Sequence, residues 1–227
     1  GSGPDAAAAP LPQAPQLTRS DVVIVDKPGA AQSQIRIGWV GVPRSTTEYA
    51  TLEVLNTILG GSFTSRLNQN LRERNGFTYG AASIFDMRTS AGPFFATAGV
   101  QTDKTAEALK EFFVELEAIR RPVPEAELTR AKNYVALSFP SEFETSRDLA
   151  QKLEELIVYH LPDDTYRTFV SAVEKVTVAD VQKAAATHIQ PDKMAVVVVG
   201  DRKLIEPGIA ALELGTIRIV PIEEFFK

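Results

Sequence analysis

The sequence contains no cysteine and only two histidines among its 227 residues. Without cysteine, the chain has no disulfide framework, no thiolate nucleophile and no sulfur ligand for zinc. No stretch approaches the ~18 consecutive apolar residues of a membrane-spanning helix, and the start lacks the basic-then-apolar order of a signal peptide. Because Gly1-Ser2-Gly3 resembles a cloning scar, we expect the natural N-terminus to be missing. These absences leave the compartment undecided.

Several catalytic motifs are also absent. Zinc hydrolases place two histidines and a glutamate in patterns such as H-x-x-E-H, whereas His160 and His188 stand apart. Both lie at predicted helix ends, where an imidazole complements the helix dipole, so we interpret both as structural. There is no G-x-S-x-G and no Walker A motif, and Gly200 is not followed by the further glycines of a dinucleotide site. The sequence therefore predicts no metal and no cofactor bound by this chain.

The charge balance argues against a nucleic-acid or anionic-membrane partner. The formal net charge is −5, whereas phosphate binding depends on clustered lysine and arginine on a basic face. Arg66, Arg72 and Arg74 form a local exception. An apolar fraction of 44% with 23% charged residues is typical of a globular protein.

The order of predicted elements indicates an α+β fold. Strands are predicted over residues 21–26, 34–42, 77–87, 93–102, 194–199 and 216–220, and helices dominate residues 124–188. Because strands and helices are segregated rather than alternating, we expect a mostly antiparallel sheet with helices packed on one face. We predict one domain over residues 18–227. Residues 1–17 are interpreted as the cloning scar and an Ala/Pro-rich linker.

Residues 60–80, GGSFTSRLNQNLRERNGFTYG, combine two turns, a short basic helix and a returning strand. Gly60 and Gly61 are predicted to stop a helix and turn the chain with positive φ, and Asn75-Gly76 predicts the second turn. Apolar residues four positions apart predict a helical stripe that faces the core: Phe63, Leu67 and Leu71. Period-two spacing predicts one shared strand face for five residues: Phe77, Tyr79, Ala81, Ser83 and Phe85.

Arg72 and Tyr79 flank the reversal at Asn75-Gly76. A guanidinium at the end of a helix and a phenol near the start of the returning strand can converge on one point, and both groups donate hydrogen bonds. From spacing alone, a simpler interpretation is favoured: Arg72 in a surface ion pair and Tyr79 as a half-buried strand aromatic.

The segment LNTILGGSFTSRLNQNLRERNGFTYGA resembles the signature of the C-terminal, non-zinc domain of the zinc peptidase family that includes pitrilysin, insulin-degrading enzyme and the mitochondrial processing peptidase. The stretches DKPGAAQSQIRIG, GPFFATAGVQTDKTAEAL, SFPSEFET and VVVVGD resemble the bacterial members. The resemblance covers roughly residues 21–220 and implies the processing-peptidase-like metallohydrolase fold.

The resemblance also implies a role for the Arg72/Tyr79 pair. In that family, Arg and Tyr seven residues apart bind substrate and face a zinc site across a clamshell chamber. This implies that Arg72 and Tyr79 bind a peptide substrate and stabilise its oxyanion, with Phe77 as a chamber-lining residue. The zinc belongs to an N-terminal domain or a partner subunit of the same family, and a homo- or hetero-dimer is expected. The family's bacterial members favour the periplasm over the cytoplasm.

Two other functions remain open. Some members of the family have lost peptidase activity and serve as assembly subunits of membrane complexes, which makes a scaffold role an alternative. A peptide-binding module without turnover is a further one. In each case we expect the isolated chain to be inactive.

Overall fold

The computed structural model describes residues 14–226. The predicted scar and most of the predicted linker therefore lie outside the described residues. Gln16, at the end of that linker, accepts a hydrogen bond from the Val40 backbone N–H at 3.2 Å. The one-domain boundary at residue 18 stays a prediction.

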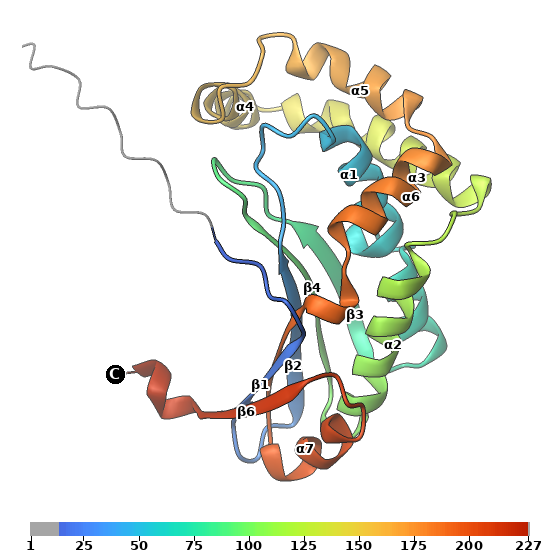
Figure 1. Ribbon diagram of the computed structural model, residues 1–227. Helices are drawn as coiled ribbons and strands as arrows, with labels where there is room; N and C mark the ends of the chain where they lie inside the picture. Colours follow the sequence, from blue (N-terminus) through green and yellow to red (C-terminus); the bar gives the residue numbers. More distant parts are fainter. Residues whose placement is uncertain (1–13, 227) are drawn as a thin grey trace, which may run out of the picture.

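Six strands form one mixed sheet in the order β3-β4-β2-β5-β1-β6 (Figure 1). Their bounds are β1 (Asp21–Asp26), β2 (Gln32–Val40), β3 (Thr78–Phe85), β4 (Pro93–Gln101), β5 (Ala195–Gly200) and β6 (Thr216–Pro221). The pairs β3–β4, β4–β2 and β2–β5 are antiparallel, whereas β1 lies parallel to both β5 and β6. Strand β3 forms one edge of the sheet.

The helices gather on one face of this sheet (Figure 1). The α-helices are α1 (Tyr49–Asn56), α2 (Thr105–Ala118), α3 (Glu125–Ser138), α4 (Ser146–Val158), α5 (Thr165–Lys175), α6 (Val178–His188) and α7 (Arg202–Ala210). Two π-helical segments, η1 (Thr57–Gly61) and η2 (Asn68–Arg74), lie between α1 and β3. Short 3-10 helices are η3 (Thr102–Lys104), η4 (Phe139–Phe143), η5 (Pro191–Lys193) and η6 (Ile222–Phe226). The predicted α+β fold with helices on one face is confirmed.

The core lies between the sheet and these helices. Alternate residues of the central strands are buried, as period-two geometry requires, including Ile35 and Ile37 of β2 and Phe94 of β4. They pack in one cluster with Leu55 of α1 and Phe112 of α2. Each fully buried side chain of this size contributes about 1.5–3 kcal/mol relative to exposure. This layer fixes the sheet edge on which the candidate site is built.

His188 connects α6 to the start of α1. Its Nε2 lies 2.9 Å from a carboxylate oxygen of Glu48, and its side chain is largely buried. His160 lies exposed beyond the end of α4 with φ of 52°. In the described residues, every helix falls short of the length and apolar character that a membrane crossing requires.

Candidate functional site

The site begins where η1 ends against the edge strand. A Cβ on Gly60 would lie 2.3 Å from the backbone nitrogen of Ser83, so only glycine allows η1 to approach β3 this closely. Neither Gly60 nor Gly61 has a positive φ, so the prediction that they turn the chain with positive φ is wrong. The second predicted turn is confirmed, because Gly76 has a φ of 65°.

The basic helix between Gly61 and the turn at Gly76 covers residues 66–74 and ends in η2. Leu67 and Leu71 are fully buried, as predicted, whereas Phe63 is 63% exposed. The predicted stripe is therefore wrong for Phe63. It lies in the turn before the first helical residue and does not follow the helical period. The Phe63 ring instead lies under the Arg72 guanidinium. The guanidinium carbon is 4.4 Å from the centre of the ring.

A β-bulge in β3 sets the direction of Tyr79. Thr78 pairs with Val100 and Ala81 pairs with Ala98, so two residues of β3 lie opposite Gly99 alone. Ala81, Ser83 and Phe85 share one buried face of the strand, as the period of two predicted, but the extra residue displaces Tyr79 from that face. Tyr79 is 90% exposed, which contradicts both the shared strand face and the half-buried interpretation.

Asn68 holds the turn, the helix and the bulge together. Its buried side-chain amide donates to the Ser62 carbonyl at 3.1 Å, and its oxygen accepts from the Ala81 backbone N–H at 3.0 Å. The Thr78 hydroxyl adds a bond of 2.7 Å to the Gly99 carbonyl. Since both ends of the Asn68 amide are satisfied, the position of the bulge relative to the helix is well determined.

These elements border an open groove of about 530 Å³. Its lining includes Phe63, Tyr79, Gln34, Thr97 and Tyr134. Arg72 does not line the groove itself, but its one-third-exposed guanidinium lies over the ring of Phe63, which does. Glu73 lies 3.6 Å from Arg72, a surface ion pair that leaves the guanidinium accessible.

Phe77 does not line this groove. It is half-buried and packs against the hydrophobic core. Of the three residues predicted for the site, Tyr79 lines the groove, Arg72 reaches it only through its contact with Phe63, and Phe77 packs against the core. Phe63 is the lining aromatic that the sequence prediction assigned to the core.

A second, polar cavity of about 260 Å³ lies among α1, α3 and α5 and also borders Tyr134. Burial raises the pKa of Glu53 to about 6, and nearby Arg44 opposes that rise. Arg44 is itself buried, with its guanidinium carbon 3.5 Å from the centre of the Tyr49 ring. Burial also raises the pKa of Tyr49. Sequence analysis missed these groups because they come together only through helix packing.

The described residues do not fit a zinc site. Within residues 14–226, no group of three or more His, Cys, Asp or Glu side chains is placed to hold a metal ion. His188 is engaged with Glu48, and His160 lies on a different helix end.

Known proteins support a family assignment. The family model described as "Peptidase M16 inactive domain" matches residues 2–135. An uncharacterized zinc protease of Mycobacterium tuberculosis is 26% identical over 172 residues, which cover 75% of this chain and 39% of that protein. This chain therefore spans about two fifths of the length of that relative.

Solved structures agree with this assignment. A peptidase M16 inactive domain from Pseudomonas fluorescens matches with a TM-score of 0.78 and 27% identity, over 87% of this chain and 47% of that one. A chain of complex III2 from Candida albicans shares the fold alone, with a TM-score of 0.70 and 14% identity over 83% of this chain and 48% of its own. The family model covers more than half of the 227 residues, and the chain belongs to the peptidase M16 inactive-domain family.

Proposed function

We propose that this chain is the substrate-holding half of a zinc metallopeptidase. The observation that supports the proposal most is that one groove is lined by the exposed Tyr79 phenol and by Phe63, whose ring carries the accessible Arg72 guanidinium. The groove is open and is lined by residues of β3, β4 and β2, and such an open groove can accept a peptide in an extended conformation. The substrate class is therefore a peptide, bound by side-chain donors of this chain.

Both donors act on the carbonyl oxygen of the scissile peptide bond. A phenol and a guanidinium each donate a hydrogen bond to that oxygen, and these bonds strengthen as negative charge develops on it. Donors that bind the transition state more tightly than the ground state raise the rate of the chemical step. Arg72 and Tyr79 thus contribute to turnover, whereas Phe63 orients Arg72.

The zinc chemistry belongs to a second domain or subunit of the same family, since residues 14–226 offer no group of side chains that fits a metal site. That zinc, when bound, activates the attacking water. The match covers 39% of the M. tuberculosis zinc protease, so the rest of that relative is long enough to contain such a domain. The partner of this chain is accordingly a zinc-bearing domain, in one polypeptide or in a dimer.

A scaffold role is the second candidate, supported by the shared fold with a chain of complex III2 from C. albicans. A scaffold has no need of two accessible donors beside a groove. A peptide-binding module without turnover is distinguished by saturable peptide binding that a zinc-bearing partner does not convert into cleavage.

Reconstitution tests the proposal. The chain is combined with a zinc-bearing domain of the same family, and cleavage of a fluorogenic peptide is measured for each component and for the mixture. We expect cleavage only in the mixture. Tyr79→Phe should slow it, whereas Tyr159→Phe, at the end of α4 and outside the groove, should not. A mixture whose cleavage is unaffected by Tyr79→Phe would favour the scaffold role.

A further inference from the structure

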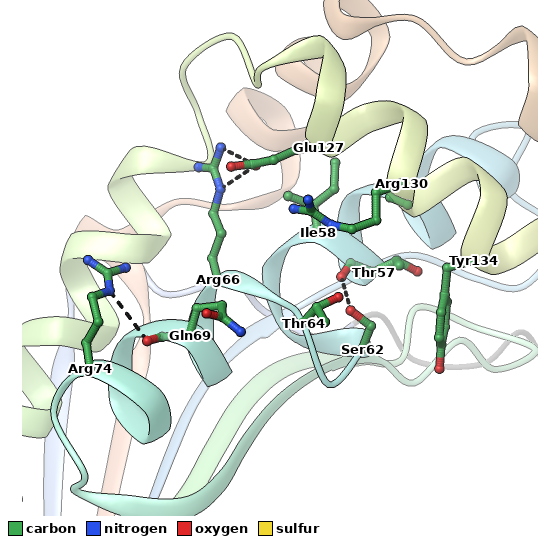
Figure 2. A pocket seen from close by; sticks show the side chains of 11 residues that line it. Thr57, Ile58, Ser62, Thr64, Arg66, Gln69, Arg74, Glu127, Arg130 and Tyr134 are labelled. Carbon is green, nitrogen blue, oxygen red and sulfur yellow. Dashed lines mark hydrogen bonds and ion pairs between the residues drawn. The ribbon is translucent and has the colours of Figure 1, made fainter.

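A separate small pocket of about 150 Å³ lies between α3 and the basic helix at residues 66–74 (Figure 2). Figure 2 shows that one wall comes from the turn and helix that carry Thr64, Gln69 and Arg66, and the other from α3 with Arg130. The pocket is lined by the side chains of Arg66, Arg74, Arg130, Glu127, Thr64, Gln69 and Tyr134, among others. It has three guanidinium groups and one carboxylate, in a chain of net charge −5.

The charges of this pocket do not cancel. Arg66 and Glu127 neutralise each other, because one Glu127 oxygen lies 2.9 Å from Arg66 Nε and 2.8 Å from its terminal nitrogen. Arg74 is held more loosely, 3.7 Å from Glu115. Arg130 forms no ion pair with any residue between 14 and 226. One guanidinium is thus free to bind an anion.

Neutral donors surround the same space. The side chains of Thr64, Gln69 and Tyr134 make no hydrogen bond to other groups in the described part of the chain. Hydroxyl, amide and guanidinium groups can together donate hydrogen bonds to an acceptor with several oxygens. The planar guanidinium of arginine also matches the geometry of carboxylate and phosphate. Since a water molecule occupies about 30 Å³ in the liquid, the pocket suits a group of a few heavy atoms.

We propose that this pocket binds an oxyanion, either the carboxylate of a peptide or free inorganic phosphate. Arg130 supplies the charge, and Thr64 and Gln69 supply the neutral donors, whereas the Tyr134 hydroxyl points away from Arg130 (Figure 2). Ser62 and Tyr134 line both this pocket and the Tyr79 groove, so an acidic group of a peptide in that groove has a direct route to Arg130. The site itself does not rest on the peptidase function.

Two-dimensional NMR of the ¹⁵N-labelled 227-residue chain tests this site. The chain is titrated at constant ionic strength with inorganic phosphate, with a capped glutamyl peptide, and with the matching glutaminyl peptide. We expect saturable shifts of the amides at residues 62–69 and 130–134. Saturation by the glutamyl but not the glutaminyl peptide identifies a peptide carboxylate, and tighter saturation by phosphate identifies a free oxyanion.

Variants make the test specific. Arg130→Gln should weaken binding by roughly tenfold or more, as expected for losing a hydrogen bond to a charged group. Arg167→Gln, on the exposed face of α5 and outside the pocket, should leave binding unchanged. The proposal is overturned if neither phosphate nor the glutamyl peptide gives saturable shifts, or if Arg130→Gln binds like the wild type. Because no zinc-bearing partner is involved and Arg72 and Tyr79 stay intact, this result is independent of the peptidase test.

Discussion

The guanidinium carbon of Arg72 lies 4.4 Å from the centre of the Phe63 ring, and Phe63 lines the groove beside Tyr79. This contact holds a long, flexible side chain against a residue that lines the groove. A cation over an aromatic face at an exposed position is worth about 0.5–1 kcal/mol, enough to favour one orientation of Arg72.

We therefore predict that Phe63→Leu impairs the reconstituted peptidase without unfolding the chain. Losing the ring face should lower kcat/KM by roughly 2–5-fold, the equivalent of about 0.5–1 kcal/mol. Thermal stability should change little, since the side chain is mostly exposed. Leu204→Ala, at a comparably exposed position on α7, is the control. Equal kcat/KM for Phe63→Leu and the wild type would show that the ring does not orient Arg72.

Gly60→Ala should destabilise the fold. The new Cβ would lie 2.3 Å from the Ser83 nitrogen, a backbone atom that can shift only with the whole strand. Overpacking of this kind costs typically ~1–3 kcal/mol. Gly80→Ala is the matched control, because its Cβ would meet only the Asn68 side chain, at 3.8 Å. Thermal melts should show a clear loss for Gly60→Ala alone, and equal melting temperatures for the two variants would contradict the close approach of η1 to β3.

Glu53 should make stability depend on pH. Burial raises its pKa to about 6 from 4.5, so the folded state favours the protonated carboxyl. Its contribution is therefore fully present below about pH 4.5 and is lost as the pH rises through 6. A difference of this size corresponds to about 1–2 kcal/mol.

Glu53→Gln tests this because it removes the ionisable proton while keeping the shape. Relative to the wild type, the variant should gain stability at pH 7.5 compared with pH 4.5 in denaturant titrations. Glu154→Gln, an exposed position on α4, is the control. A gain of the same size at both pH values would show that ionisation of Glu53 does not cost stability.

Local chemistry predicted much of the fold but only part of the site. The turn at Asn75-Gly76 and the buried Leu67 and Leu71 follow from propensities and periods that act within a few residues. The direction of Tyr79 does not, because the bulge exists only through pairing with β4. The same holds for the parallel pairing of β1 with β5 and β6.

Groups assembled from distant segments were the least predictable. Arg130 reaches its pocket from α3, about sixty residues after Thr64 and Gln69, and no spacing in the sequence links them. The role of Gly60 was misassigned for a similar reason. Its constraint is the strand that packs against it rather than its own φ.

The central claim is that Arg72 and Tyr79 act together on one carbonyl oxygen, and a double-mutant cycle in the reconstituted peptidase tests it most directly. Steady-state kinetics are measured for wild type, Arg72→Ala, Tyr79→Phe and the double variant, alongside thermal melts. Each single change should lower kcat by roughly 10²–10³, the usual effect of removing an oxyanion donor. The double variant should lose less than the product of the two, because groups acting as a unit are not additive. Unchanged kcat and KM in all three variants, with intact melts, would contradict the claim.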